Sequence, residues 1–364
     1  MRKKDNSDSY FMQKALNLAK RTKGFTSPNP IVGAVIVKNN KIISSGYHKA
    51  AGKPHAEVEA IRKIDKQSLK GASLYINLEP CSHFGLTSPC VDEIIKHKLK
   101  QVVISVPDPN PKVNGTSIRK LRKAGIKVSL GLLKNEALRA NEVFFKNMLK
   151  RSTFVTAKVA QSLDGKIATA KGISKWITSK NSRDFAKSLR DEHDAILVGI
   201  NTVIKDDPLL KGNKRNPFKV IIDPSLRIKP NSKILKNNPK KVIIFAAKSS
   251  KKKAKNIKPG VRVFFLDKNK DSTLSLSKIL KILFKLGIMS VFVEGGSFTL
   301  GRFFDEKLID KMHFFISTKI IAGKDALGSI SGVGAKNPNF CSKLGDLKIE
   351  KIDQDLHIWG YPSY

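Results

Sequence analysis

The sequence contains few cysteines, few acidic residues and few large aromatic residues. Its 364 residues include 3 cysteines, 2 tryptophans and 5 tyrosines. Three cysteines cannot build the disulfide framework of a small secreted domain, so we expect a reducing, cytoplasmic environment. No continuous apolar run is long enough to cross a bilayer, and no apolar signal segment follows the charged beginning of the chain. These absences predict a protein with neither a membrane anchor nor a secretory leader.

The shortage of acidic residues leaves a large positive charge. Lysine and arginine total 69 against 30 aspartates and glutamates, which gives a formal net charge of +39. Such a charge is typical of nucleic-acid binding, but it also arises when lysines are scattered over solvated faces. The lysines run along the whole chain, with their densest cluster in a predicted loop at residues 248–258. We favour scattered charge and predict no nucleic-acid partner, while a basic protein also suits a phosphorylated small substrate.

The order of predicted elements indicates two α/β domains. Strands and helices alternate up to residue 150, and the pattern restarts with a strand at residues 154–160. We therefore predict domains of residues 1–150 and 151–364, each large enough for its own core. Predicted helices include residues 8–21, 55–64, 136–150, 181–192, 273–286 and 298–307, and predicted strands include residues 31–37, 73–78, 101–106, 195–198, 219–222, 241–246 and 290–294.

One stretch of the first half carries a metal motif. His55-Ala56-Glu57 is followed by Pro80-Cys81 and by Cys90, a pattern typical of zinc-dependent base deaminases. One imidazole and two thiolates hold Zn²⁺ and leave its fourth position for water, which the metal activates at neutral pH. A carboxylate that is not a ligand must then move the proton from water to the ring nitrogen and the leaving amine. Glu57 is predicted to do this.

A closed structural zinc site is the alternative interpretation. Such a site needs a fourth Cys or His ligand, and His83 could supply it. Cys341, the remaining cysteine, lies far away in the second predicted domain. We expect Cys341 to be a small buried apolar residue.

In the second half, the most informative run is Phe292-Val293-Glu294-Gly295-Gly296-Ser297. A hydrophobic strand leads through two glycines into a predicted helix, whose first N–H groups can bind a phosphate. By itself this signal is weak, because many strand-to-helix turns carry paired glycines for tight packing. No G-x-G-x-x-G run follows a strand, so the usual dinucleotide fingerprint is absent. Spacing alone leaves Glu294 either a ligand contact or a solvated edge residue.

Taken together, these motifs resemble the bifunctional riboflavin-biosynthesis deaminase/reductase family, from about residue 10 onward. Eight residues separate Cys81 from Cys90, whereas nucleic-acid-editing deaminases have two between their cysteines. In the first half the matching motifs are Ser27-Pro28-Asn29-Pro30-Ile31-Val32-Gly33, Gly46-Tyr47-His48, His55-Ala56-Glu57 and Pro80-Cys81-Ser82-His83. In the second half they are Ser162-Leu163-Asp164-Gly165-Lys166, Ser174-Lys175-Trp176-Ile177-Thr178-Ser179, Thr202-Val203, Asp206-Asp207-Pro208 and Val293-Glu294-Gly295-Gly296.

The resemblance implies a cytidine-deaminase-like three-layer α/β domain followed by a dihydrofolate-reductase-like domain. The first would use Zn²⁺ to remove the 2-amino group of a phosphorylated pyrimidine, 2,5-diamino-6-(5-phosphoribosylamino)pyrimidin-4(3H)-one. The second would use NADPH to reduce the ribosyl chain to ribityl, giving 5-amino-6-(5-phosphoribitylamino)uracil. Family precedent also implies a homo-oligomer. A rival hypothesis is a structural zinc domain attached to a working reductase.

The resemblance also implies roles for individual residues. Substrate contacts would be Asn29, His48 and His83 in the first domain and Lys158, Ser174, Arg190, Leu210 and Glu294 in the second. Cofactor contacts would be Ala160, Trp176, Thr202, Asp206, Gly296, Ser297, Phe298, Thr299, Leu300, Gly301 and Arg302. This assignment favours a functional role for the paired glycines.

Two positions depart from the family pattern. Leu86 stands where the family usually has Lys or Arg, and Asn213 stands where it tends to have Arg. Lys211, Lys214 or Arg215 would be the electrostatic substitutes for the second loss, although a lysine does not reproduce the bidentate guanidinium. We expect both activities to survive with altered substrate affinity.

Overall fold

The computed structural model describes residues 2–82, 89–111 and 113–364. The chain divides into two compact units, Met1–Arg151 and Ser152–Tyr364, which are described separately below. His83 and Leu86, singled out in the sequence, lie outside the described residues. In the described part of the chain, no helix combines the length and the apolar character needed to cross a membrane.

The first unit is built on a five-stranded sheet with the order β2-β1-β3-β4-β5. Strand β1 is antiparallel to both β2 and β3, whereas β3, β4 and β5 run parallel. The strands are β1 Gly33–Lys38, β2 Lys41–Tyr47, β3 Ser73–Ile76, β4 Gln101–Ile104 and β5 Lys127–Leu130. The helices are α1 Arg2–Lys20, α2 Ala56–Ile61, α3 Lys66–Leu69, α4 Cys90–Lys96, α5 Thr116–Lys123, α6 Lys134–Ala140 and α7 Glu142–Lys150.

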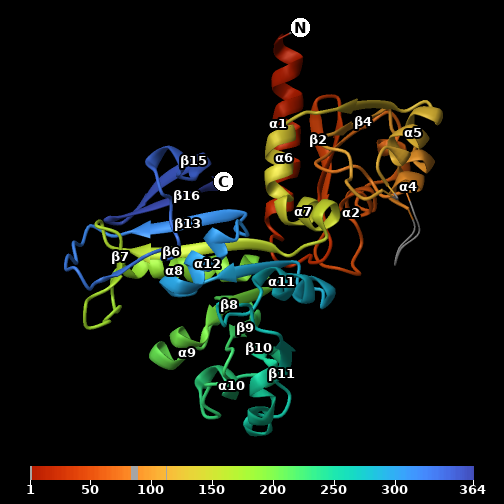
Figure 1. Cartoon of the computed structure of the whole chain (residues 1–364). Coiled ribbons are helices and arrows are strands. Elements are labelled where there is room, and N and C mark those ends of the chain that lie inside the picture. The colour runs from red at the N-terminus through yellow and green to blue at the C-terminus, as the bar shows by residue number, and fades with distance from the viewer. Residues whose placement is uncertain (1, 83–88, 112) are drawn as a thin grey trace. The chain divides into compact units, whose positions relative to one another are not determined.

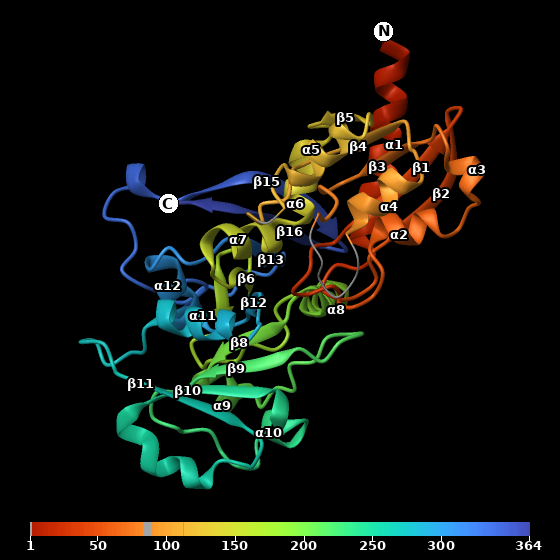
Figure 2. The same cartoon turned by 90° about the vertical axis from the view of Figure 1, so that its right-hand side faces the viewer.

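Helices cover both faces of this sheet, which gives three layers (Figures 1 and 2). Alternate residues of each strand point to opposite faces: Val35 and Val37 pack with α1, α6 and α7, whereas Ala34 and Ile36 pack with α2, α4 and α5. Glycines in β1 and β2 allow two helices to approach the sheet closely. A Cβ on Gly33 would lie 2.1 Å from the Ala15 carbonyl oxygen of α1. The fit of α2 against β2 at Gly46 is similarly tight, and it holds the beginning of α2 close to the sheet.

The second unit contains a nine-stranded sheet with the order β11-β10-β9-β8-β12-β6-β13-β16-β15. Its first seven strands in that order are parallel, and the hairpin of β16 and β15 closes one edge antiparallel (Figure 1). The strands are β6 Phe154–Gln161, β8 Ala195–Gly199, β9 Phe218–Ile222, β10 Val242–Ala247, β11 Arg262–Leu266, β12 Ser290–Val293, β13 Lys311–Ile316, β15 Lys343–Ile352 and β16 Asp355–Ser363. A separate pair is formed by β7 Lys166–Ala168 and β14 Leu327–Gly328.

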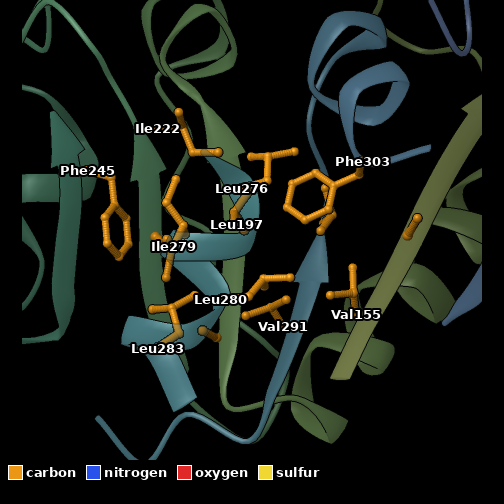
Figure 3. Close-up of a cluster of buried hydrophobic side chains, with 14 of the residues drawn as sticks. Val155, Leu197, Ile222, Phe245, Leu276, Ile279, Leu280, Leu283, Val291 and Phe303 are labelled. Carbon is orange, nitrogen blue, oxygen red and sulfur yellow. The ribbon is translucent and has the colours of Figure 1, made fainter. Parts of the chain in front are cut away.

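The main core of the second unit lies between the sheet and α11 and α12. Helix α11 places Leu276, Ile279, Leu280 and Leu283 on one face, the i, i+3, i+4, i+7 spacing of an amphipathic helix (Figure 3). Helices α8, α9 and α10 cover the opposite face of the sheet, and smaller apolar clusters lie between them and the strands. The helices are α8 Lys180–Leu189, α9 Ile200–Asp206, α10 Lys233–Lys236, α11 Leu276–Lys285 and α12 Ser297–Asp305, and the 3₁₀ segments are η1 Arg190–Glu192, η2 Pro239–Lys241, η3 Lys248–Asn256 and η4 Pro338–Phe340.

Three sequence expectations about structure are wrong. The predicted helix at 136–150 is broken at Asn141, whose side chain exchanges two hydrogen bonds with the backbone of Ile31. The predicted loop at 248–258 is largely the 3₁₀ segment η3, and Cys341, expected to be buried, is exposed.

Candidate functional site

Three potential metal ligands meet in the first unit. His55 is the N-cap of α2, Cys81 follows the end of β3, and Cys90 is the first residue of α4. His55 Nδ1 lies 3.1 Å from Cys90 Sγ and 3.5 Å from Cys81 Sγ, and the three ligating atoms lie within 4.8 Å of one another. Hydrogen bonding to Cys90 lowers the pKa of Cys81 to about 4, which favours the thiolate that a metal binds. The chemistry and convergence of these donors fit Zn²⁺.

Glu57 lies in the first turn of α2, two residues after His55. It is 2% exposed and lines the same cavity as His55 and Cys81. Burial raises the pKa of Glu57 to about 7, and the charge of Cys81 adds to this shift. A buried carboxyl beside a metal site, and outside the ligand set, is the arrangement that proton transfer requires.

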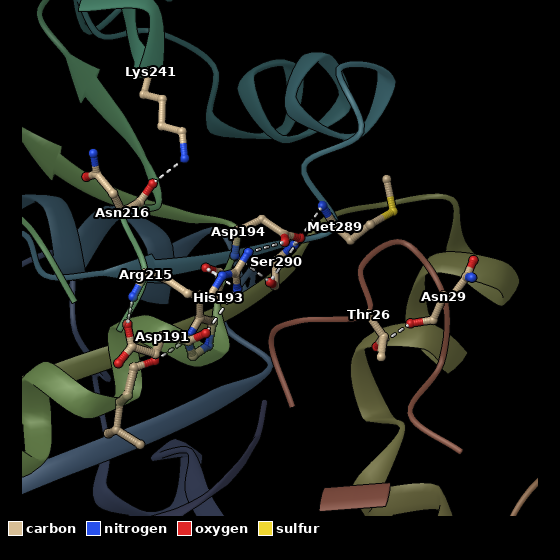
Figure 4. Close-up of polar contacts among 11 residues, drawn as sticks. Thr26, Asn29, Asp191, His193, Asp194, Arg215, Asn216, Lys241, Met289 and Ser290 are labelled. Atoms are coloured by element: carbon tan, nitrogen blue, oxygen red, sulfur yellow. Dashed lines mark hydrogen bonds and ion pairs between the residues drawn. The ribbon is translucent and has the colours of Figure 1, made fainter. Parts of the chain in front are cut away.

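The cavity has a volume of about 250 Å³, and its lining includes Asn29 and His48, two of the substrate residues that the family resemblance implies. His48 Nδ1 lies 3.1 Å from the Pro54 carbonyl oxygen, which can only accept, so Nδ1 carries the proton. Its Nε2 then accepts from Asn29 Nδ2 at 3.2 Å, while burial lowers the pKa of His48 and favours the neutral ring. Asn29 is itself held in a turn with Thr26 (Figure 4). The amide of Asn29 can therefore present a fixed donor and acceptor to a ring.

The sequence analysis missed part of the lining of this cavity. Asp108 and Asn110 line it, and Glu79 holds their loop in place. The Glu79 carboxylate accepts backbone hydrogen bonds from Asp108 at 3.2 Å, Gly115 at 3.0 Å and Ser117 at 3.1 Å. The turn signal Asp108-Pro109-Asn110-Pro111 directly after a predicted strand could have identified this loop. The role of Glu79 could not, because its partners are 29 or more residues away.

In the second unit, Glu294 binds two of the predicted substrate residues. Arg190 donates from Nε to Glu294 Oε1 at 2.5 Å and from Nη2 to Oε2 at 3.0 Å. Lys158 Nζ lies 3.5 Å from Glu294 Oε2. Burial would raise the pKa of Glu294, but Arg190 and Lys158 outweigh it and lower the pKa to about 2. Glu294 is thus ionised and held by two cations at the carboxyl end of β12, so it is not a solvated edge residue.

A larger cavity, of about 610 Å³, adjoins this edge of the sheet. Of the predicted cofactor residues, Thr202, Gly296, Ser297, Phe298, Thr299 and Arg302 line it. Leu300 lies outside the lining because its side chain packs in the core, and Gly301 lies outside it, packed against the Ser331 backbone. Ala160, Trp176 and Asp206 also lie outside it, and Trp176 is exposed with Arg183 over its ring at 4.3 Å.

The start of α12 fits a phosphate group of a dinucleotide. Ser297 Oγ is buried and has no hydrogen-bond partner among the described residues. A Cβ on Gly295 would lie 2.6 Å from Thr299, so only glycine lets this turn pass so close to the helix. A buried hydroxyl and free N–H groups at a helix start are the groups that bind phosphate oxygens. This part of the cavity therefore fits NADPH.

The remaining two predicted substrate residues differ in how deeply they are buried. Ser174 is half-buried, whereas Leu210 is 5% exposed and packs in the core under α9 and α10. Leu210 can therefore offer a ligand its backbone but little of its side chain.

Comparison with known proteins decides the family. The family model for the cytidine and deoxycytidylate deaminase zinc-binding region matches residues 5–106, and that for the RibD C-terminal domain matches residues 153–358. The riboflavin biosynthesis protein RibD of Aquifex aeolicus is 43% identical over 356 residues, covering 97% of this chain and 98% of that protein. The chain belongs to the RibD family. The Escherichia coli RibD is 36% identical over 373 residues, covering 97% of this chain and 99% of that protein.

Solved RibD structures share the whole fold. RibD of Acinetobacter baumannii, form 1, matches with a TM-score of 0.88 at 34% identity, covering 99% of this chain and 100% of that chain. The diaminohydroxyphosphoribosylaminopyrimidine deaminase/5-amino-6-(5-phosphoribosylamino)uracil reductase of Thermotoga maritima matches with a TM-score of 0.88 at 36% identity, covering 99% of each chain. Membership confirms the predicted family, fold class and cofactors: this is a riboflavin-biosynthesis enzyme that combines a zinc-dependent deaminase with an NADPH-dependent reductase.

Proposed function

We propose that residues 1–151 deaminate 2,5-diamino-6-(5-phosphoribosylamino)pyrimidin-4(3H)-one and that residues 152–364 reduce the product's ribosyl chain to ribityl. The observation that carries this division is the placement of buried Glu57 and the His55–Cys81–Cys90 cluster around one cavity of the first unit. The ion-paired Glu294, two residues before Gly296 in the lining of a larger cavity of the second unit, supports the second half.

In the proposed deaminase site, His55, Cys81 and Cys90 would hold zinc, which would activate the attacking water. Glu57 takes one proton from the attacking water and passes it to the ring nitrogen. It then moves the second proton of that water, from the new hydroxyl group, to the departing amine. The C–N bond to the 2-amino group breaks, a C=O bond forms, and ammonia leaves. Asn29 and His48 orient the pyrimidine, because their hydrogen-bonded pair is held in one tautomer by the Pro54 carbonyl.

In the proposed reductase site, NADPH supplies a hydride to C1′ of the ribosyl group when it is bound along α12. The ring-opened sugar also takes up one proton, so ribosyl plus hydride plus proton gives ribityl. Glu294 accepts hydrogen bonds from the sugar hydroxyls, and Lys158 donates to the sugar oxygens. Arg190 keeps Glu294 ionised and in place through its paired hydrogen bonds.

A coupled assay tests both halves together. Purified protein mixed with the diaminopyrimidine ribotide should consume NADPH, measured by absorbance, and zinc removal by chelation should stop consumption on this substrate. Adding already deaminated substrate to the chelated protein should restore consumption, because the reductase site contains no ligand of the zinc cluster. NADPH loss that continues on the undeaminated substrate after zinc has left, as measured by metal analysis, would contradict the proposed order of reactions.

A second test concerns the phosphate of the substrate in the reductase. The Asp191 carboxylate holds the loop of residues 211–215, because it accepts hydrogen bonds from the backbone N–H groups of Asn213, Lys214 and Arg215. The Arg215 side chain donates to the Asp191 carbonyl and pairs with Asp194 (Figure 4). These contacts tie Arg215 to the fold, which leaves Lys211 and Lys214 as the substitutes for the missing arginine.

Asn213→Arg should therefore lower the KM for the ribotide by about three- to fivefold, the effect of one partly exposed ion pair. Asn339→Arg adds the same charge at an exposed position in the same unit and should leave the KM unchanged. Leu86→Lys is the matching change for the deaminase. Equal KM values for Asn213→Arg and the unaltered protein would show that the loop does not reach the phosphate.

We also propose that the protein forms a homo-oligomer through the edge of the second unit and works in the cytoplasm. The edge strand β15 exposes Ile349, and the segment before it exposes Val333 at 86% and Phe340 at 80%. Exposed apolar side chains beside unpaired strand edges favour association with a second copy. Light scattering should give a mass above that of one chain, and Ile349→Lys should lower it. None of Cys81, Cys90 and Cys341 forms a disulfide, which supports a reducing compartment.

A further inference from the structure

The cavity of the first unit is acidic in its buried part and basic where it meets solvent. Three of its lining residues carry almost completely buried carboxyl groups: Glu57 is 2% exposed, Glu79 3% and Asp108 8%. Among the described residues that line the cavity, Lys53 is the sole lysine or arginine, and it is exposed. The charge of zinc would balance the two thiolates of its ligands but not these carboxyl groups. The cavity therefore offers its single cation at the rim.

Lys53 is carried on a turn that is anchored on both sides. The Lys53 N–H donates to the Ala50 carbonyl at 3.1 Å, which closes the turn. The His48 ring, before the turn, binds the carbonyl of Pro54, directly after Lys53, at 3.1 Å. The next residue, His55, is the N-cap of α2 and a predicted zinc ligand. The backbone of Lys53 is therefore fixed two residues from the metal cluster, while its long side chain can follow a ligand at the cavity rim.

The ammonium group of Lys53 is available to a ligand. Within the part of the chain that the structure describes, no carboxylate pairs with it and no acceptor binds it. Lys49, four residues earlier, is different, because it pairs with Glu59 of α2 at 3.5 Å and lies outside the cavity lining. Of these two neighbouring lysines, Lys53 is therefore the one whose charge can act on a molecule in the cavity.

The distribution of charge fixes the direction in which a phosphorylated pyrimidine can enter. A phosphate group carries nearly two negative charges at neutral pH, so the buried carboxyl groups repel it from the inner part of the cavity. An uncharged pyrimidine ring does not meet this repulsion and can reach Glu57 and the metal cluster. The ring therefore enters first, and the phosphate stays at the rim, where Lys53 lies.

We propose that Lys53 binds the 5′-phosphate of the deaminase substrate and makes the first unit select the phosphorylated pyrimidine over the free riboside. This inference rests on the proposed deaminase function. An ammonium group is a compact point charge with three donors, which suits a phosphate whose position at the rim is not fixed by a rigid fork. Leu86 leaves the chain without the cation that the family usually has at that position, so the charge of Lys53 is the compensation that the described residues offer.

Comparison of the ribotide with its dephosphorylated riboside tests the proposal. Ammonia release by the full chain would give kcat/KM for each compound, and the unaltered protein should prefer the ribotide. Lys53→Gln should lower the ratio of the two kcat/KM values by about fivefold, the effect of one partly exposed ion pair. Lys53→Arg should retain most of the ratio, and added salt should lower it more in the unaltered protein than in Lys53→Gln. Lys49→Gln, which removes the paired lysine outside the lining, should leave the ratio unchanged.

The outcomes separate this inference from the proposed function. If the unaltered protein releases ammonia but the ratio is the same in Lys53→Gln, the inference fails and the deaminase assignment stands. A fall in kcat/KM that is equal for ribotide and riboside would also overturn it, because a lysine that only supports the turn beside the zinc ligands would affect both compounds alike. Equal kcat/KM values for the two compounds in the unaltered protein would overturn it as well. If the unaltered protein releases ammonia from neither compound, the deaminase assignment itself fails.

Discussion

Replacing Glu57 with glutamine is expected to slow ammonia release by about 10²–10⁴-fold, the usual contribution of a positioned proton-transfer group. Glutamine keeps the size and polarity of the side chain but cannot take up and return a proton. The three predicted ligands, His55, Cys81 and Cys90, are untouched, so zinc content should be retained. NADPH oxidation with deaminated substrate should also be retained, because Glu57 belongs to the first unit.

Ammonia release, bound zinc and NADPH oxidation would be measured on the same preparation. Glu59→Gln is the matched control: it removes a carboxylate from the same helix, one that pairs with Lys49 at 3.5 Å, and it should leave ammonia release unchanged. If Glu57→Gln released ammonia at the normal rate, another group would be moving the proton. If it lost zinc, Glu57→Gln would be assayed again at saturating zinc, and full activity there would contradict the role.

The second large effect is expected from Glu294→Gln, which should reduce NADPH oxidation by about a hundredfold or more while ammonia release persists. The change removes the acceptor that orients the sugar and leaves Arg190 and Lys158 without their shared carboxylate. Activity would be followed with deaminated substrate below the unfolding temperature of the variant. Asp353→Asn, which alters an exposed carboxylate of the same unit, should change neither reaction. Normal NADPH oxidation in Glu294→Gln would show that Glu294 is not part of the reductase site.

The same variant should also destabilise the second unit. Removing one partner of a buried ion pair costs about 3 kcal/mol, at the lower end here because Arg190 and Lys158 keep 20% and 19% of their side-chain surface exposed. This corresponds to a Tm lower by about 6–12 °C. A carboxyl with a lowered folded pKa stabilises the fold above its unfolded pKa, and this contribution is lost as the pH falls toward the folded value.

The pKa of Glu294 is about 2 against a usual 4.5. Its contribution to the free energy of unfolding should therefore be complete at neutral pH and should disappear between about pH 4.5 and about pH 2. Thermal unfolding of both proteins at several pH values measures this. The difference in Tm between the unaltered protein and Glu294→Gln should narrow as the pH falls through that window. A difference that stayed constant down to pH 2 would contradict the assigned charge state.

Local patterns were sufficient for the metal site and for most of the elements. His55 and Glu57 are two residues apart at a helix start, and Cys81 ends a strand turn, so short-range geometry already places a ligand next to a carboxyl. The amphipathic spacing in α11 similarly predicts both a helix and its buried face. These features were readable because each depends on residues within a few positions of one another.

Other features depend on partners far apart in the chain. Arg190 and Glu294 are 104 residues apart, Asn141 breaks a helix by binding Ile31, and Glu79 organises a loop 29 or more residues away. The lining of the larger cavity likewise combines Arg227 and Lys268, which follow the separate strands β9 and β11. By itself, the sequence predicted the ligand types, a carboxyl next to them and the alternation of strands and helices, because these follow from local spacing. Only the tertiary structure decided which distant charges meet, because pairing across a sheet depends on strand order, which local periodicity does not encode.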